Sequence, residues 1–226
     1  MDAIYSDEGS SVKKIKVLLV DDHAVVRAGF RMLLSAQDFI DEIVDIDRGE
    51  LVTQEYTQLQ PDVVVMDLSM PGIGGLEAIR RLIKQYSDAI VLVYSIHDEA
   101  IYVERALQAG AKGYVSKNSA PEILAEAVQA VVNGDVYIES ELLHESNDVS
   151  QDQVEQYRAV VDLLSPREFD VFCLLAKGMN AHEAAAQLCL GYKTVANYNT
   201  QIKHKLKVTT AADLAHIAMI LGVIKH

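Results

Sequence analysis

The stretch that decides the fold reads Pro61-Asp62-Val63-Val64-Val65-Met66-Asp67, followed by Leu68-Ser69-Met70-Pro71-Gly72-Ile73-Gly74-Gly75. Its apolar run is short, β-branched and free of charge, which predicts a strand buried on both faces, as in a parallel sheet. Asp67 comes directly after that strand, and the Pro and Gly residues beyond it predict a sharp turn. Because open α/β sheets bind ligands outside the carboxyl ends of their strands, Asp67 is the first candidate for chemistry. A helix-capping role is a poor alternative, because the next helix is expected to begin near Gly74.

Strands and helices alternate five times in the first part of the chain. Predicted strands cover residues 15–20, 43–46, 63–66, 89–94 and 113–116, and predicted helices follow at 25–34, 51–59, 76–86, 99–109 and 120–132. This strict alternation predicts a doubly wound α/β domain, with a five-stranded parallel sheet and helices on both faces. The usual strand order of such a unit is the flavodoxin-like 2-1-3-4-5, which places the first and third strands side by side.

That order gathers polar residues from four strand ends. Asp21 and Asp22 follow the first strand and are therefore expected beside Asp67. Three carboxylates in one crevice repel each other unless a cation is present, and hard oxygen ligands favour Mg²⁺. Ser95 ends the fourth strand and Lys117 follows the fifth, so chance is a poor explanation for the set.

The charge of the chain is unevenly distributed. The net charge is −13, and residues 1–140 carry −11, residues 141–164 carry −5 and residues 165–226 carry +3. An acidic domain and an acidic connector thus precede a mildly basic tail. This asymmetry fits a tail that binds nucleic acid, although the basic excess is small.

Composition predicts a cytoplasmic protein with no membrane partner. No apolar run reaches membrane-spanning length, and the polar, acidic residues 1–12 show no signal-peptide pattern and are expected to be disordered. Cys173 and Cys189 lack metal-ligand spacing, and we expect both to be core thiols in a reducing compartment.

The C-terminal part predicts a bundle of four helices. Ser165 is the expected N-cap of the first, with Pro166 at the first helical position and Glu168 completing a capping box. The next helices are expected at 181–188, 192–206 and 210–221, and a short helix, a tight turn and a longer helix make a helix-turn-helix. On the longer helix the apolar stripe consists of Val195, Tyr198, Ile202 and Leu206. The outward face presents Lys193, Thr194, Ala196, Asn197, Thr200, Lys203 and Lys207.

The first part of the chain resembles the receiver domains of two-component response regulators. The resemblance rests on Asp21-Asp22-His23, on the Asp67 loop with Met70-Pro71-Gly72, on Ser95 and on the segment around Lys117. It implies that Asp67 accepts a phosphoryl group from a histidine kinase. It also implies that Mg²⁺ is held by Asp22, Asp67 and the backbone carbonyl of Ser69, with Asp21 acting partly through metal-bound water.

The same resemblance assigns roles to three further residues. Lys117 offers an ammonium and Ser95 a hydroxyl to phosphoryl oxygens, and Tyr114 occupies an aromatic switch position. Two alternatives remain open, because Ser95 also suits a strand-end cap and Tyr114 also suits the core. Asn118 departs from the family, where proline often follows the lysine. His97 is assigned no role.

The C-terminal part resembles the output domain of the NarL/FixJ (LuxR-type) class. The resemblance rests on Leu164–Glu168, on Lys193-Thr194-Val195 and on Leu206-Lys207-Val208. Within that class the receiver is most similar to the GacA/UvrY branch. The implied organisation is an extension at 1–12, a receiver at 13–138, a linker at 139–163 and a DNA-binding helix-turn-helix domain at 164–226. Ala196 departs from the class, because a basic residue is often found there.

Together these patterns predict a phosphorylation-activated transcription factor rather than an enzyme. It is expected to bind promoter DNA as a homodimer, with a receiver that restrains the tail until Asp67 is phosphorylated. If the acidic receiver and connector lie near the recognition helix, they would repel the DNA backbone and cover Asn197 and Lys203 directly. One alternative is an adaptor whose tail has lost DNA affinity. Another is a phosphatase- or dehalogenase-like hydrolase, but such enzymes need a second acid two residues after the nucleophile, where this chain has Ser69.

Overall fold

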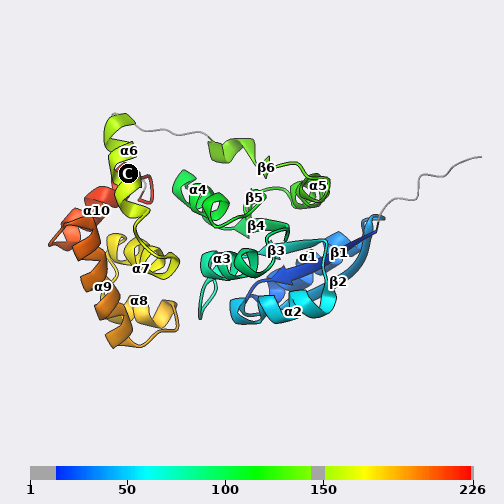
Figure 1. The fold of residues 1–226 in the computed structure, drawn as a ribbon, viewed down its shortest axis with the longest axis horizontal. Helices are drawn as coiled ribbons and strands as arrows, with labels where there is room; N and C mark the ends of the chain where they lie inside the picture. Colours follow the sequence, from blue (N-terminus) through cyan, green and yellow to red (C-terminus); the bar gives the residue numbers. More distant parts are fainter. Residues whose placement is uncertain (1–13, 144–150, 225–226) are drawn as a thin grey trace, which may run out of the picture.

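The computed structural model of the chain describes residues 14–143 and 151–224. Figure 1 shows a sheet with helices on both faces, and a helical C-terminal domain that lies beside the helices covering one of these faces. The extension expected at 1–12 lies outside the described residues. Among the described helices, none combines the length and apolar character that crossing a membrane requires.

The sheet is fully parallel, with the order β2-β1-β3-β4-β5-β6. Its strands are β1 (Ile15–Val20), β2 (Ile40–Ile46), β3 (Val63–Met66), β4 (Val91–Ser95), β5 (Gly113–Ser116) and β6 (Tyr137–Ile138). The predicted order 2-1-3-4-5 is confirmed, but the five-stranded sheet is corrected to six strands, because β6 pairs with β5. Two residues are too short a run to show a strand period, so the sequence pattern could not reveal β6.

Five helices cover the two faces of the sheet. They are α1 (Ala24–Ser35), α2 (Val52–Leu59, preceded by the 3-10 turn Gly49–Leu51), α3 (Gly75–Gln85), α4 (Ala100–Gln108) and α5 (Pro121–Val132). Alternate strand residues point to opposite faces. Val63 and Val65 pack with the residues of α1 and α5, whereas Val64 and Met66 pack with those of α2, α3 and α4. Both cores are therefore filled from the one apolar stretch that precedes Asp67.

The C-terminal domain consists of four helices, as predicted. They are α7 (Pro166–Ala176), α8 (Ala181–Gln187), α9 (Tyr192–Leu206) and α10 (Ala211–Ile220). The region predicted as a linker contains the 3-10 turn η2 (Ser140–Leu143) and the helix α6 (Gln151–Val161). The stripe predicted for α9 faces inward, since Val195, Ile202 and Leu206 are buried and Tyr198 packs against them.

Both caps predicted for α7 are present. The Ser165 hydroxyl accepts a hydrogen bond from the Glu168 amide at 3.3 Å, and the Glu168 carboxylate accepts one from the Ser165 amide at 2.7 Å. The same carboxylate meets the Lys205 ammonium of α9 at 2.5 Å. The residue that completes the cap thus also fastens the first helix of the domain to the helix-turn-helix.

One prediction about the cysteines is wrong. Cys173 is buried, as expected, but Cys189 is exposed. It lies beyond the end of α8, with a left-handed φ of 51°. The turn therefore removes it from the helical stripe that suggested a core position.

Replacing Ser165 by alanine should destabilise the C-terminal domain by about 1 kcal/mol, because the N-cap oxygen is lost. Ser165→Thr keeps a hydroxyl and is the matched control, with a smaller expected loss. Urea unfolding followed by circular dichroism measures both. Equal midpoints for Ser165→Ala and the unaltered chain would contradict the role of this cap.

Candidate functional site

Asp67 lies at the carboxyl end of β3, buried between β1 and the turn before α3. Its amide donates to the Val20 carbonyl of β1 at 2.9 Å, and its side-chain Oδ1 accepts from the Ser69 amide at 3.2 Å. The turn requires a glycine at position 75, because a Cβ there would lie 2.1 Å from the Asp67 carbonyl oxygen. The Gly-rich loop therefore lets the chain fold closely over the candidate acceptor.

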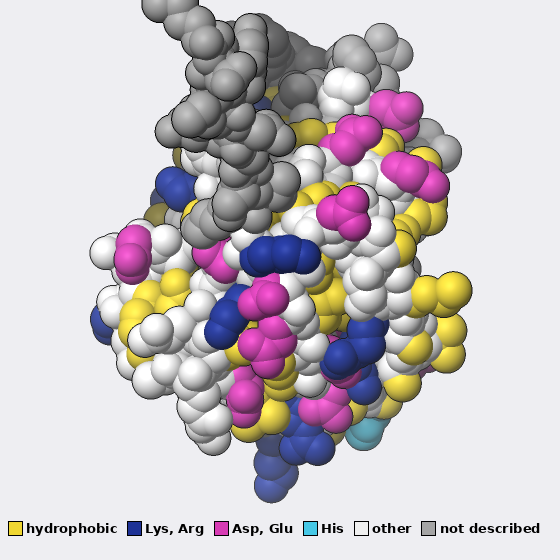
Figure 2. All heavy atoms as spheres, turned by 90° about the vertical axis from the view of Figure 1, so that its right-hand side faces the viewer, with side chains coloured by type: hydrophobic (Ala, Val, Ile, Leu, Met, Phe, Trp, Pro, Cys, Tyr) yellow, Lys and Arg dark blue, Asp and Glu magenta, His cyan; other side chains and the backbone are white. Residues whose placement is uncertain are grey.

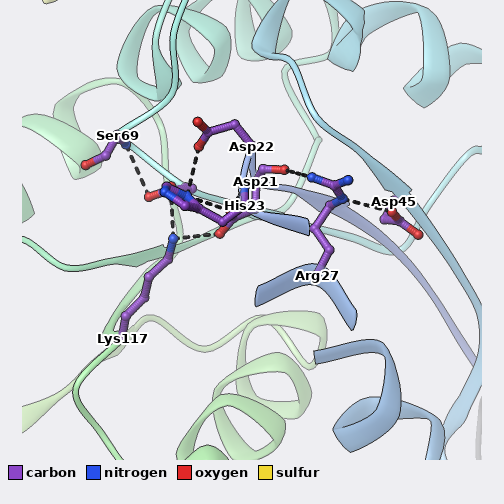
Figure 3. A network of polar contacts seen from close by, with 8 residues as sticks. Asp21, Asp22, His23, Arg27, Asp45, Ser69 and Lys117 are labelled. Carbon is purple, nitrogen blue, oxygen red and sulfur yellow. Dashed lines mark hydrogen bonds and ion pairs between the residues drawn. The ribbon is translucent and has the colours of Figure 1, made fainter. Parts of the chain in front are cut away.

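The Lys117 ammonium joins two buried carboxylates at this edge of the sheet. Its Nζ lies 2.6 Å from Asp21 Oδ2 and 2.9 Å from Asp67 Oδ2 (Figure 3). Arg27 holds the same edge by donating to the Asp21 carbonyl at 2.7 Å. The structure thus brings together the residues predicted from the ends of β1, β3 and β5.

The electrostatics of Asp67 result from opposing effects. Burial raises the pKa of its carboxyl above the usual value, and Asp21 raises it further, while the Lys117 ammonium lowers it. Ionised Asp67 is therefore disfavoured in the folded protein relative to the unfolded chain. A bound cation would offset that penalty.

The donor set fits a hard divalent cation. Asp21, Asp22, His23 and Asp67 each offer an atom, and these atoms lie within 4.8 Å of one another. Asp22 Oδ1 and Asp67 Oδ2 are buried and accept no hydrogen bond from the described residues. The nitrogens that contact them are those of the ion pairs, His23 Nδ1 for Asp22 and Lys117 Nζ for Asp67. Carboxylate oxygens with spare acceptor capacity suit Mg²⁺.

Ser95, Tyr114 and His97 form a group next to the acceptor. The His97 amide donates to Ser95 Oγ at 3.3 Å, and the Tyr114 hydroxyl donates to the His97 carbonyl at 2.7 Å. Tyr114 is fully buried. This burial suits the core role that the sequence leaves open for Tyr114, and its role as a switch stays a prediction.

His97 makes contacts at the site that sequence reasoning missed. Its Nε2 and the Ser69 hydroxyl share a hydrogen bond of 3.0 Å, and its ring stacks on Tyr102 with centroids 4.0 Å apart and planes at 3°. Burial lowers its pKa to about 4, with Lys177 and Lys117 adding to the effect, so the ring is neutral at pH 7. Its partners belong to β3–α3 and α4, and no local spacing reveals such contacts.

Asn118 supports the loop after β5 in a way that proline could not. Its amide donates to Ser116 Oγ at 3.1 Å, and its side chain donates to Asp98 at 3.0 Å. Ser116 in turn donates to Asp98 at 2.5 Å. The departure from the family residue therefore ties the loop that carries Lys117 to the loop that carries His97.

The predicted DNA-contacting face of α9 is open to solvent. Lys193, Thr194, Asn197, Thr200 and Lys207 are exposed, while Ala196 and Lys203 are half-buried. Two of these side chains already have partners, since Lys203 donates to the Thr209 carbonyl at 2.9 Å and Thr200 to the Ala196 carbonyl at 3.1 Å. By contrast, the receiver end in Figure 2 mixes acidic and basic side chains without one continuous basic face.

The receiver contacts α7 and the end of α6, not the recognition helix. Arg105 of α4 donates to the carbonyls of Val161 and Leu164 at 2.9 and 2.5 Å, and its guanidinium lies 4.3 Å from the centroid of the Phe169 ring. Tyr102 meets the same ring edge to face. In the described residues the receiver therefore does not lie over the recognition helix, so the direct cover considered from the sequence does not operate in this structure (Figure 1).

Replacing Asp67 by asparagine should stabilise the fold near pH 7, on the order of 1 kcal/mol. The raised pKa means that the ionised side chain costs stability above that pKa, and that this cost disappears as pH falls and the carboxyl protonates. The gain of Asp67→Asn over the unaltered chain should therefore shrink toward acid pH. Urea unfolding across a pH series measures it, with exposed Asp38→Asn as control. A gain that grows toward acid pH would contradict the assignment.

Both domains of the chain match known protein families. Residues 17–129 match the response regulator receiver domain, and residues 162–218 match the bacterial regulatory proteins of the luxR family. The transcriptional activator protein ExaE of Pseudomonas putida is 38% identical over 209 residues, which cover 92% of this chain and 98% of that protein. The response regulator UvrY of Escherichia coli (strain K12) is 36% identical, covering 92% and 95%.

One further relative and one solved structure support the same assignment, and a second solved structure shares the fold. The response regulator GacA of Pseudomonas aeruginosa is 35% identical, covering 93% of this chain and 98% of that protein. A LuxR-family two-component response regulator from Aurantimonas sp. SI85-9A1 has a TM-score of 0.56 at 32% identity, covering 57% and 93%. The RcsB response regulator of Salmonella typhimurium shares the fold, with a TM-score of 0.63 at 22% identity, covering 92% and 98%.

A receiver domain and a luxR-family domain thus occur in one chain, in the same order and over nearly the full length of these relatives. The protein belongs to the response regulators of the LuxR type and is a DNA-binding regulator of transcription.

Proposed function

We propose that Asp67 is the phosphoacceptor through which a sensor histidine kinase controls this regulator. The observation that carries the proposal is the buried carboxylate at the carboxyl end of β3, within 2.9 Å of the Lys117 ammonium and beside Asp21 and Asp22. A carboxylate in that position can attack a phosphorus atom, while neighbouring cations reduce its repulsion from the anionic donor.

The step is an in-line phosphoryl transfer in which one bond to phosphorus forms and one breaks. One oxygen of Asp67 forms a bond to phosphorus, the bond from phosphorus to the donor breaks, and the donor leaves with the electron pair. Mg²⁺, when held by Asp22, Asp67 and the Ser69 carbonyl, supplies positive charge against the phosphoryl oxygens. Lys117 would move its ammonium from the carboxylates to a phosphoryl oxygen, and the Ser95 hydroxyl would donate to another.

The protein acts, in this proposal, as an acceptor and not as a turnover enzyme. Ser69 occupies the position two residues after Asp67, and its hydroxyl bonds to His97. A hydroxyl in that environment is not the second acid that an aspartate-based hydrolase requires. Slow self-dephosphorylation is the only hydrolytic reaction we expect.

The contact between the two domains supports control of DNA binding in which the receiver does not cover the recognition helix. Because the recognition face is exposed, docking of α7 on α4 would regulate DNA binding by fixing the orientation of the C-terminal domain. A chain docked in this way cannot place its recognition helix freely beside that of a second copy. Release of α7 would therefore permit binding to promoter DNA as a homodimer.

Acetyl phosphate with Mg²⁺ should label Asp67 alone among the residues of the chain. Borohydride trapping followed by mass spectrometry locates the site. Asp67→Asn should abolish the label, and a chelator should also suppress it because the carboxylates then repel the donor. Label on Ser95 or His97, or undiminished label in Asp67→Asn, would refute the proposed role of Asp67.

Asn197 and Thr200 should read bases, while Lys193 and Lys207 contact phosphates. Asn197→Ala should weaken binding to the cognate site by about 1–3 kcal/mol and random DNA much less. Lys193→Ala should weaken all sequences alike and lower the salt slope by about one unit. Fluorescence anisotropy over a salt series on both DNAs, with exposed Lys112→Ala as control, distinguishes the two classes.

Two outcomes would count against this assignment. If Asn197→Ala weakens random DNA as much as the cognate site, the residue does not read bases. If the phosphorylated chain binds no DNA from a genomic pool, the C-terminal domain serves as a protein-binding adaptor instead.

A further inference from the structure

A continuous series of side-chain contacts runs from the acceptor loop to the C-terminal domain. Ser69 is in the loop after Asp67, and its hydroxyl bonds to the His97 ring at 3.0 Å. That ring stacks on Tyr102 at 4.0 Å, and Tyr102 meets Phe169 of α7 with centroids 5.2 Å apart at 69°. Every contact in the series is direct, and each residue comes from a different element or loop.

His97 contacts both the residues around the phosphoacceptor and the α4 residue that touches the C-terminal domain. Its amide donates to Ser95 Oγ and its carbonyl accepts from the Tyr114 hydroxyl, so its backbone is fixed by the residues beside the acceptor. Its ring lies between Ser69 and Tyr102. A phosphoryl group that recruits the Ser95 hydroxyl and shifts the Ser69 backbone would therefore displace His97 from two sides.

The far end of the series lies at the contact that holds the domains together. Tyr102 and Arg105, on one face of α4, both pack on Phe169. The Cys173 thiol of α7 lies against the Tyr102 hydroxyl, and burial there raises the pKa of Cys173 to about 12. Cys173 is 2% exposed, so its thiol is shielded from reagents while α7 is docked.

We propose that His97 is a positioning residue that transmits the state of the acceptor loop to the docking of α7, through its contacts with Ser69 and Tyr102. The inference rests on the proposed role of Asp67 and adds the route by which its modification acts. Tyr114 takes part by holding the backbone of His97, because its buried hydroxyl donates to the His97 carbonyl.

The docking of α7 on α4 can be followed through a cysteine that the chain already contains. In a Cys189→Ser background, Cys173 is the only remaining cysteine, and its rate of reaction with a thiol reagent measures how often α7 leaves α4. Arg105→Gln in the same background removes the hydrogen bonds to Val161 and Leu164 and gives the rate for a loosened contact.

The experiment compares Cys173 labelling with and without acetyl phosphate and Mg²⁺ in full-length protein. In the Cys189→Ser chain, phosphorylation should accelerate labelling about 5- to 150-fold, the usual range of coupling between two sites. Adding His97→Ala should leave Asp67 open to phosphorylation, checked by mass, but bring the ratio of the two rates close to unity. An unchanged ratio in His97→Ala would overturn the proposal.

Two matched variants separate a transmitting role from a merely structural one. Tyr102→Phe keeps the ring on His97 and removes only the hydroxyl, so the ratio should survive although the basal labelling rate rises. Ser69→Ala keeps the backbone carbonyl and the stack but removes the hydrogen bond to His97, so the basal rate should stay low while the ratio falls, with equal phosphorylation of Asp67 verified by mass. A full ratio in Ser69→Ala would show that the signal bypasses this contact and would also overturn the proposal.

Failure of the proposed function gives a different result. If Asp67 is not phosphorylated, or if phosphorylation leaves the Cys189→Ser chain unlabelled while Arg105→Gln is labelled rapidly, control of docking by Asp67 is wrong. The route through His97 is then refuted with it. Loss of the ratio only in the His97 and Ser69 variants is the outcome that supports the route.

Discussion

The contact between one ammonium and two buried carboxylates organises the receiver. Lys117 reaches from the end of β5 to Asp21 at the end of β1 and Asp67 at the end of β3. Removing Lys117 would cost about 3–5 kcal/mol, because two buried charges are left uncompensated, whereas Lys117 keeps Asp21 as a partner when the Asp67 charge is removed. Lys117 therefore fixes the edge of three strands and at the same time leaves the acceptor only partly neutralised. The site keeps more carboxylate charge than Lys117 can neutralise. A metal cation would therefore reduce the repulsion among the carboxylates, whereas a phosphoryl group would add to it.

Much of this edge can be predicted from sequence, because the topology of a parallel sheet determines which strand ends lie side by side. Asp21, Asp67 and Lys117 each follow a buried apolar run, and parallel strands bring such ends together. The helix caps and the stripe of α9 are predictable for the same reason, since their signals lie within one turn or one helix. Residues such as Asn197 are placed on the correct face by periodicity, although their contacts with bases remain a prediction.

The remaining features depend on partners that are distant in the chain. His97 looks like an ordinary loop residue until Ser69 and Tyr102 are seen on its two sides. Arg105 looks like a solvent-exposed residue of α4, yet it is 8% exposed because the C-terminal domain covers it. A helix period cannot distinguish a face that packs on its own sheet from one that packs on another domain. The orientation of α9 away from the receiver is likewise set by the domain contact, which no local pattern encodes.

Arg167 gives the docked state a built-in cost. Its Nη1 bonds to Asp170, whose own pKa burial raises to about 6, but its Nε and Nη2 are buried without a hydrogen-bond partner among the described residues. A Cβ on Gly74 would lie 2.9 Å from Nη1, so the guanidinium is pressed against the acceptor loop. Water would satisfy those nitrogens as soon as the domains part. This cost offsets part of the stabilisation that the docking contacts supply, and it favours an open fraction among unmodified molecules. Because promoter binding is proposed to need two open copies, background transcription from target promoters should rise more steeply than the amount of the regulator itself.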